Sequence, residues 1–531
     1  MSLLEDILTG AGTALLGKEA VNKIIINKLV NRGRNRPHPW STRFDDFISW
    51  AGLTDKTYFA RLLKADRYPD AEAVGTRKPP TADVLKLFFA DTGKQIPSAK
   101  STYLFPAFAQ YLTDGFLRTA LFNEVDPDNP VLTRRKRTTS NHEIDLSALY
   151  GRTEKQTDAL RTRKGGRLKS EMEGAEEYSP RLYDDAGQLK PEFADLDEPL
   201  GLRHGTARKT LFAAGGDRVN ANVQIAAINT LFLREHNRLA DALATANSGW
   251  DDDRLFETAR NIVIVMFLKI VVEEYINHIS TASFRFLAKP EVAWKADWNR
   301  PNWMTIEFTL LYRWHSLVPE TFRWRGVPVP WKEMRLDNSL LTKDGLANAF
   351  VEMSANPAAR MGLGNFAREL EDAEANGFKQ ARENNLAGYN AYREAMGFKR
   401  AKTFAEIVGT SKDPVEQAAR TKLAADLERL YGTVDNVEFY TGLFAEPCQA
   451  NGPLPDLLLA MVAMDAFSQA LPNPLLSEHV WGDKDNRPRA FTDWGRREID
   501  RTSTLLDLLE RNAPGLNGRF VGMTRPGWKR S

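Results

Sequence analysis

Apolar residues recur every three or four positions along most of this chain, which is the pattern of amphipathic helices. The spacing predicts helices over residues 101–121, 222–246, 254–283, 304–316, 342–353, 384–396, 414–430 and 453–470. Strand signals are few and short, with one around VPVPW at 327–331. Loops rich in Gly, Pro and Asp separate the helical stretches. The pattern predicts a large, mainly α-helical fold.

The two ends of the chain differ from this central part. Residues 1–36 place apolar positions at helical spacing and form an amphipathic helical arm, and residues 37–531 form the main domain. Two interpretations of the arm stay open, because such a helix either packs on the main body or lies on a membrane surface. Near the other end, residues 494–512 predict one amphipathic helix, followed by a poorly ordered tail.

Composition narrows the class of protein. The chain has 531 residues, of which 42% are hydrophobic and 27% charged. Its net charge of only +2 does not indicate a nucleic-acid-binding protein. Cys448 is the single cysteine, so no internal disulfide forms, which is typical of a reducing compartment. No uninterrupted apolar stretch reaches membrane-spanning length, and no secretory signal is recognised. We expect a cytoplasmic or peripheral membrane protein.

The strongest candidate for chemistry is EFTLLYRWHSLVPETF at 307–322. His315 is one of seven histidines in the chain and stands in an apolar run. Tyr312 lies three residues earlier, so the two side chains share a face if the stretch is one helix. One interpretation is a hydrogen-bonded imidazole of the core. The other is an axial ligand of haem iron with a redox-capable tyrosine beside it.

The segment Tyr-x-Trp-His followed by x-Leu-x-Pro-x-Thr-Phe resembles the proximal haem segment of the peroxidase–cyclooxygenase superfamily. This superfamily includes animal haem peroxidases, prostaglandin endoperoxide synthases and fatty-acid α-dioxygenases. Further similar blocks occur in the same order, at 141–151, 212–244, 254–283 and 384–398. The resemblance implies a mainly α catalytic domain that holds haem b between a distal helix and the His315 helix, with His315 as the axial ligand.

On the distal side, FAQYLTDGF resembles the family's distal helix. Gln110 matches the family's glutamine, but Asp114 stands where the family has a proton-transferring histidine. An aspartate is a weak base unless burial raises its pKa, and a purely structural carboxylate is the alternative. Arg218 matches the distal arginine that stabilises charge as an O–O bond breaks. Ala221 occupies the position of the family's haem-ester residue, so the resemblance implies non-covalent haem.

The loop NHEIDLSALYG at 141–151 resembles the family's calcium loop. Asp145 and Ser147 fit that pattern, but Asn141 replaces its threonine, and Gly115 replaces the aspartate of the distal helix. Calcium takes at least six oxygen ligands, and this set is depleted. We therefore do not expect a calcium ion.

Other residues take roles only through the resemblance. Asn390 matches an asparagine that hydrogen-bonds the proximal histidine, although a turn or N-cap asparagine is the alternative. Tyr312 matches the tyrosine that becomes a radical, with a packed core residue as the alternative. Three further residues carry over as substrate contacts: Arg32 for a substrate carboxylate (Arg34 or Arg36 serve equally), Trp331 as its partner, and Ser468 on the channel wall.

These residues lead to three hypotheses of function. The first is a haem-dependent fatty-acid dioxygenase that uses a Tyr312 radical and O2 to form a lipid hydroperoxide from an unsaturated fatty acid. The second is a haem peroxidase in which Asp114 and Arg218 split peroxide. The third is a haem- or lipid-binding protein without catalysis. Peripheral membrane contact through residues 1–36 and a homodimer are further expectations, and no nucleic-acid partner is expected.

Overall fold

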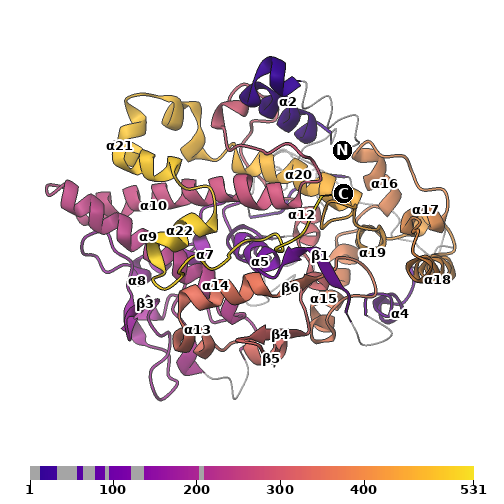
Figure 1. The fold of residues 1–531 in the computed structure, drawn as a ribbon, viewed down its shortest axis with the longest axis horizontal. Helices are drawn as coiled ribbons and strands as arrows, with labels where there is room; N and C mark the ends of the chain where they lie inside the picture. The colour runs from indigo at the N-terminus through magenta and orange to yellow at the C-terminus, as the bar shows by residue number, and fades with distance from the viewer. Residues whose placement is uncertain are drawn as a thin grey trace.

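The computed structural model describes residues 12–32, 57–63, 78–89, 95–120, 137–202 and 208–530. The chain forms the following longer helices: α2 Lys18–Val30, α5 Leu104–Phe116, α9 Val223–Ala246, α10 Asp252–Ile270, α14 Leu346–Ala355, α15 Glu371–Glu383, α18 Pro414–Tyr431, α20 Asp456–Ala470, α21 Asn486–Asp500 and α22 Leu505–Asn512. The shorter ones are α4 Thr81–Leu85, α7 Ser147–Tyr150, α8 Glu154–Leu160, α11 Asn277–Ile279, α12 Ile306–Leu311, α13 Ser339–Asp344, α16 Tyr389–Ala395, α17 Phe404–Val408 and α19 Phe439–Ala445. The mainly α-helical prediction is confirmed (Figure 1).

Strands are short and occur as three antiparallel pairs in the described part of the chain. They are β1 Pro97–Thr102 with β6 Pro357–Ala359, β2 Glu171–Glu173 with β3 Glu176–Tyr178, and β4 Thr321–Trp324 with β5 Val327–Pro330. The last hairpin confirms the strand signal at VPVPW. Because each pair has only two strands, helix packing rather than a sheet forms the core.

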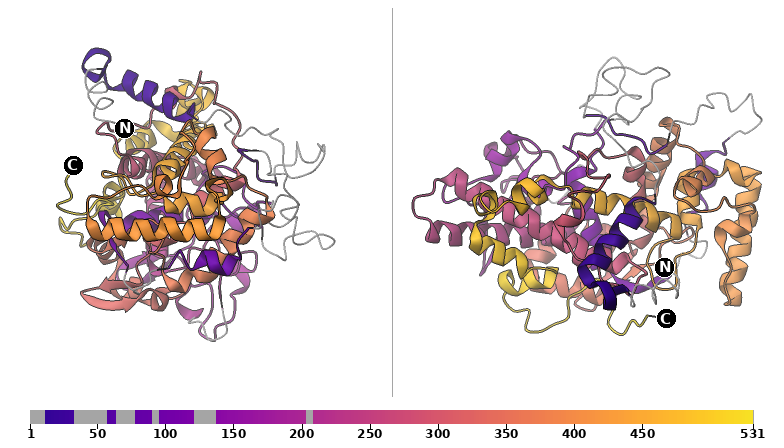
Figure 2. Two further views of the ribbon diagram at one scale, coloured as in Figure 1. Left: turned by 90° about the vertical axis from the view of Figure 1, so that its right-hand side faces the viewer. Right: turned by 90° about the horizontal axis from the view of Figure 1, so that it is seen from above.

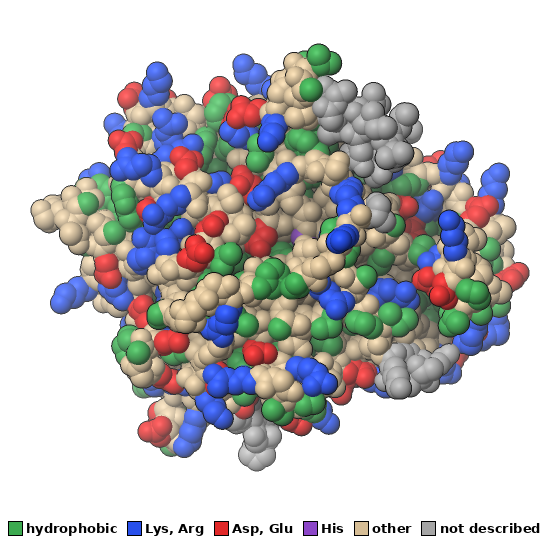
Figure 3. Space-filling view, viewed as in Figure 1, with side chains coloured by type: hydrophobic (Ala, Val, Ile, Leu, Met, Phe, Trp, Pro, Cys, Tyr) green, Lys and Arg blue, Asp and Glu red, His purple; other side chains and the backbone are tan. Residues whose placement is uncertain are grey.

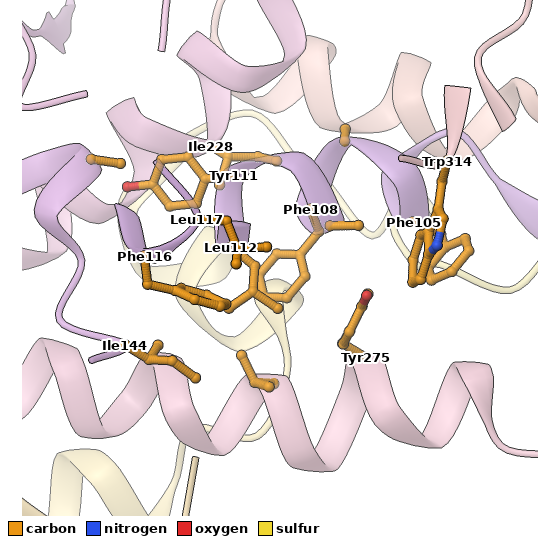
Figure 4. Packing of buried hydrophobic residues seen from close by; sticks show 14 of the residues in the cluster. Phe105, Phe108, Tyr111, Leu112, Phe116, Leu117, Ile144, Ile228, Tyr275 and Trp314 are labelled. Carbon is orange, nitrogen blue, oxygen red and sulfur yellow. The ribbon is translucent and has the colours of Figure 1, made fainter. Parts of the chain in front are cut away.

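The core is built around α5, which contacts α9, α7 and α14. Tyr111 of α5 stacks on Phe232 of α9, with ring centres 5.7 Å apart, and Phe108 meets Phe267 of α10 at 5.5 Å. Figure 4 shows these α5 side chains pointing into one continuous apolar cluster. Each such ring contributes about 1.5–3 kcal/mol by leaving water. This packing fixes α5, the predicted distal helix, within the interior.

Side-chain caps start the two long helices at the positions that the sequence indicates. The Asn222 side chain accepts a hydrogen bond from Ile225 N at 3.1 Å before α9, and Asp251 accepts one from Arg254 N at 2.8 Å before α10. Such caps satisfy otherwise unpaired N–H groups of the first turn. The predicted single helix over 254–283 is interrupted, because a π-helical turn at Val271–Ile276 separates α10 from α11.

The predicted helix over 304–316 is wrong at its C-terminal end. Helix α12 stops at Leu311, and His315 begins a separate 3₁₀ turn, His315–Leu317. Trp314 has ψ of 42°, and its indole N–H donates to the Leu311 carbonyl that the His315 amide would take in a continuous helix. Tyr312 and His315 therefore do not share the face of one helix.

The N-terminal helix α2 packs on the main body. Val21, Ile26 and Val30 are buried, and the helix contacts α20 and the 3₁₀ turn Pro290–Val292. The Trp298 indole donates to Asn27 Oδ1 at 2.8 Å. Figure 2 shows α2 along the outer surface of the molecule. The predicted boundary at residue 36 lies outside the described residues, as do Arg34 and Arg36. Within the described helices, none is long and apolar enough to cross a bilayer.

The C-terminal part corrects two predictions. The expected single helix over 494–512 is two helices, because a Thr504 capping box starts α22 anew after α21 ends at Asp500. The tail expected to be poorly ordered packs along β1, where the Thr102 amide donates to the Met523 carbonyl at 2.9 Å.

The surface mixes both charge signs on the face shown in Figure 3, in keeping with the small net charge.

Candidate functional site

His315 is held by a buried carboxylate. Its Nδ1–H donates to Oε1 of Glu374, in the first turn of α15, and the second oxygen, Oε2, accepts a hydrogen bond from the Tyr440 hydroxyl at 2.7 Å. The Glu374 side chain is fully buried, whereas 26% of the His315 side chain is exposed. No described residue hydrogen-bonds Nε2 of His315, so this nitrogen is available to a ligand.

The prediction that Asn390 hydrogen-bonds His315 is wrong. Asn390 is the second residue of α16, and its side chain accepts from the Ala401 amide at 2.8 Å and donates to the Ala401 carbonyl and to Asp435. These bonds fasten the loop after α16, as the alternative of a turn asparagine proposes. Glu374 occupies the role at His315 instead.

Tyr312 is placed in an aromatic pocket at the end of α12. Its ring stacks on Trp314, with centres 4.8 Å apart, and meets Phe308 edge-on at 4.9 Å. Its hydroxyl interacts with the phenol of Tyr275, from the π-helical turn. Burial raises the pKa of Tyr312, the contact with Tyr275 opposes this shift, and the charge of Asp465 on α20 adds to it. The phenol therefore keeps its hydrogen at neutral pH.

Asp114 is a buried carboxylate without a hydrogen bond. It is 2% exposed, and neither oxygen has a hydrogen-bond partner among the described residues. Arg218 Nη1 lies 3.9 Å from Asp114 Oδ1, so the structure brings together these two predicted residues. Burial raises the pKa of Asp114 to about 7, and the charge of Arg218 partly opposes this. The carboxyl group can thus take up and release a proton near neutral pH.

The surroundings of Asp114 are rigid. Arg118 and Asp217 form a buried ion pair at 3.2 Å. A Cβ atom at Gly216 would lie 2.5 Å from Asp114 Oδ2, so this backbone approaches the carboxylate as only glycine permits. Gln110, one turn earlier on α5, is half-buried, and its side-chain amide has no described hydrogen-bond partner. Gln110 and Asp114 lie on neighbouring turns of one helix, as the spacing predicts.

The loop that resembles a calcium site closes on itself. The Asn141 amide donates to Asp145 Oδ2 at 2.8 Å, and the Ser147 hydroxyl donates to the Gly115 carbonyl at 3.1 Å. A Cβ atom at Gly115 would come within 2.9 Å of Ser147 Oγ, which leaves no room for an aspartate there. In the described part of the chain, no three His, Cys, Asp or Glu side chains are grouped to hold a metal ion.

The three predicted substrate residues do not form one site. Arg32 donates to the Met396 carbonyl at 3.1 Å and covers Phe398, whereas Trp331 follows β5 and contacts Tyr103. Figure 1 places α2 and β5 at opposite edges of the molecule, so the pairing of Arg32 with Trp331 is wrong. Ser468 is buried on α20, one turn after Asp465. The Ser468 hydroxyl donates to the Asp465 carbonyl at 3.2 Å, and its place on a channel wall stays a prediction.

Sequence reasoning missed Glu374, Tyr275 and Asp465. Glu374 lies in the acidic run EDAE, which is typical of a solvated first turn. The one available signal was its spacing to Gly377 and Phe378, three and four residues later, which places it on the buried face of α15.

The residues present fit a haem group. A metal-ligating histidine commonly donates its other ring N–H to a carboxylate, which fixes the tautomer and leaves Nε2 for the iron, and His315 is held in that way. The unsatisfied oxygens of buried Asp114 are the second indication, because a buried polar group without a protein partner commonly serves a ligand or water.

Comparisons with known proteins identify the family of this chain. The family model described as animal haem peroxidase matches residues 115–520. Prostaglandin G/H synthase 1 of Oryctolagus cuniculus is 29% identical over 482 residues, which are 89% of this chain and 73% of that protein.

Two solved structures have the same fold. The fatty acid alpha-dioxygenase of Oryza sativa superposes with a TM-score of 0.70 at 16% identity, covering 98% of this chain and 96% of the other. Peroxidase A of Dictyostelium discoideum gives 0.67 at 18% identity, covering 88% and 95%. The chain belongs to the animal haem peroxidase family, whose members are haem-dependent oxidoreductases.

Proposed function

We propose that this protein is a haem-dependent fatty-acid dioxygenase in which Tyr312 carries the radical. The observation that carries the proposal is the half-buried phenol of Tyr312, which lies among aromatic rings three residues before the proposed iron ligand His315. The similarity to prostaglandin G/H synthase 1 and to a fatty acid alpha-dioxygenase supports the substrate class.

The chemistry follows from the groups around Tyr312. Haem bound through Nε2 of His315 would supply the oxidising power to remove one electron together with the phenolic proton from Tyr312, which leaves a neutral radical. The Tyr312 radical takes a hydrogen atom from a carbon of the fatty acid, and O2 adds to that carbon. Return of a hydrogen atom from Tyr312 yields the hydroperoxide and regenerates the radical. The rings of Phe308 and Trp314 pack against the phenol and limit its contact with water.

Oxygen uptake by the haem-loaded protein with an unsaturated fatty acid tests this proposal. We expect Tyr312→Phe to reduce uptake at least about 100-fold, because the ring remains but the hydrogen donor is lost. Tyr178→Phe is the matched control, since Tyr178 is a buried tyrosine of β3 whose hydroxyl bonds Glu176. Full uptake by Tyr312→Phe would reject the radical role.

A second candidate function is favoured by the distal geometry. Asp114 has both oxygens unpaired and a pKa of about 7, with Arg218 3.9 Å away, so a peroxide could transfer its proton to Asp114 while Arg218 stabilises the negative charge. In this peroxidase, Asp114→Asn abolishes peroxide turnover and Tyr312→Phe leaves it intact. Normal haem occupancy without consumption of oxygen or peroxide by the wild type would support a non-catalytic binding protein instead.

For the cofactor, we propose non-covalent haem b and no calcium. Ala221 has no carboxylate for an ester bond, and the oxygens of the loop at 141–151 hydrogen-bond within the loop and to Gly115. Extraction into acidified organic solvent distinguishes free haem from haem that remains bound to protein. Metal analysis of the purified protein checks the second point.

We also propose that the protein is cytoplasmic or peripheral to a membrane, whose surface it would contact through the N-terminal arm that includes α2. Leu15, Leu16 and Ile24 are 85%, 60% and 56% exposed, and Lys18 and Lys23 are exposed on the same arm. Apolar and basic side chains together bind an anionic bilayer surface. Flotation with anionic vesicles tests this, with a triple Ser substitution of the three apolar residues as the comparison. The homodimer stays a prediction for sedimentation analysis.

A further inference from the structure

The contact between His315 and Glu374 is more than a means to orient the imidazole. Both oxygens of Glu374 accept hydrogen bonds, one from His315 Nδ1 and one from the Tyr440 hydroxyl, and the side chain is fully buried. A protonated carboxyl group would have to donate through one of these oxygens. With His315 Nδ1–H and the Tyr440 hydroxyl as the donors, both oxygens of Glu374 are acceptors, which is the hydrogen-bonding pattern of a carboxylate.

Among the described residues, no Lys or Arg forms an ion pair with Glu374. The Arg313 guanidinium donates instead to the Ala373 carbonyl at 3.3 Å and to Gln380 Oε1 at 2.7 Å. His315 and Tyr440 are therefore the groups that share the negative charge of Glu374. In a low-dielectric interior, hydrogen bonds to a charged acceptor are strengthened.

The fold holds Tyr440 firmly in this arrangement. A Cβ atom at Gly377, one turn after Glu374, would come within 3.1 Å of the Tyr440 hydroxyl, so glycine makes room for the phenol. The Tyr440 ring stacks on Phe88 at 5.9 Å and meets Phe378 edge-on at 5.1 Å. These contacts aim the hydroxyl at Glu374 Oε2 and leave Oε1 to the histidine.

We propose that Glu374 is an anionic positioning residue that gives the His315 ring imidazolate character, and that Tyr440 limits this effect by sharing the charge. The proposal rests on the proposed role of His315 as the iron ligand. A more negative ligand stabilises the ferric over the ferrous state, so Glu374 lowers the Fe(III)/Fe(II) midpoint potential, and loss of the Tyr440 hydroxyl lowers it further.

The test is the midpoint potential of haem-loaded variants, measured by spectroelectrochemistry. Glu374→Gln keeps the size and an acceptor oxygen but removes the charge, and we expect the equilibrium to shift at least about tenfold toward ferrous iron, which is about 59 mV. Tyr440→Phe keeps the aromatic ring, and we expect it to shift the equilibrium toward ferric iron, by less than the shift in Glu374→Gln. The ferrous iron–histidine stretching frequency falls in Glu374→Gln and rises in Tyr440→Phe.

Glu446→Gln is the matched control. Glu446 is also buried and also accepts from a tyrosine, Tyr389, but it does not contact His315. The haem midpoint potential of Glu446→Gln should equal that of the wild type. An unchanged potential in Glu374→Gln, or shifts of the same sign in Glu374→Gln and Tyr440→Phe, would overturn the proposal and indicate structural loosening.

The His315→Ala variant separates this inference from the proposed function. If it binds haem with the wild-type Soret band and potential, the ligand assignment itself fails, and the inference fails with it. If His315→Ala loses the band while Glu374→Gln retains both the band and the wild-type potential, the ligand assignment stands and only the role of Glu374 is rejected.

Discussion

Two carboxylates lie deep in this protein, and their surroundings are opposite. Glu374, beside His315, has a hydrogen-bond donor on each oxygen. Asp114, on helix α5, has a donor on neither oxygen among the described residues, although Arg218 lies 3.9 Å away. The hydrogen-bonding capacity of the first group is met by its partners, whereas burial raises the pKa of the second to about 7.

This difference distinguishes a carboxylate that orients a neighbouring side chain from one that is free to react. A satisfied carboxylate fixes the orientation of its neighbour and needs nothing more, while an unsatisfied one costs free energy until a proton or a ligand reaches it. The contacts of Glu374 therefore fix the position of its neighbour, whereas the surroundings of Asp114 suit the uptake and release of a proton. The following changes test that contrast.

The largest effect on stability is expected from the buried Arg118–Asp217 ion pair near Asp114. Arg118→Ala leaves Asp217 charged and unpaired in the interior, because both side chains are 1% exposed. Breaking a buried ion pair in this way costs about 3–5 kcal/mol of unfolding free energy. Urea unfolding followed by circular dichroism measures it. Arg163→Ala, which breaks an exposed pair with Asp158, is the control and should cost less than about 1 kcal/mol.

The second effect is a dependence of stability on pH. Because the folded-state pKa of Asp114 is raised to about 7 from 3.8, the folded protein binds a proton that the unfolded chain has released between these values. Stability from this group is therefore full below pH 3.8 and is lost as pH rises through 7. Between pH 5 and 8 the wild type should lose about 3 kcal/mol that Asp114→Asn does not lose. Equal pH profiles for the two proteins would contradict the buried, unpaired state of Asp114.

A smaller effect on stability is expected from Asn390, without an effect on the haem. Asn390→Ala removes the bonds to Ala401 and Asp435 and should lower the unfolding free energy by about 1–3 kcal/mol. The haem spectrum and midpoint potential should stay at the wild-type values, since Asn390 does not contact His315. A shift in potential as large as that of Glu374→Gln would restore the role that the resemblance implies.

The smallest effect is expected from calcium. Excess calcium or a chelator should change the melting temperature by less than about 1 °C, because a bound ion would stabilise the folded state in proportion to its affinity. Thermal unfolding in the two conditions provides the measurement. A marked stabilisation by calcium would show that the loop around Asp145 opens to admit the ion.

Much of the fold could be predicted from periodicity, since α9, α18 and α20 lie close to the predicted ranges. Apolar spacing did not predict where a helix ends or where its hydrogen-bonding pattern changes. The Trp314 indole ends α12 by taking the Leu311 carbonyl, and a π-helical turn at Val271–Ile276 re-aims Tyr275 toward Tyr312. Neither event leaves a signal in the spacing of apolar residues, because both depend on contacts with other helices.

The sequence by itself determined the helical class, the resemblance to haem oxidoreductases and the residue types His315, Tyr312, Asp114 and Arg218, since these depend on local spacing and motif. Only the tertiary structure decided which groups meet them. Glu374 and Asn390 lie 59 and 75 positions after His315 in the chain, and packing rather than sequence distance selected Glu374 as the partner. Both carboxylates are buried, and tertiary contacts give Glu374 a donor on each oxygen but leave Asp114 without one, with a raised pKa.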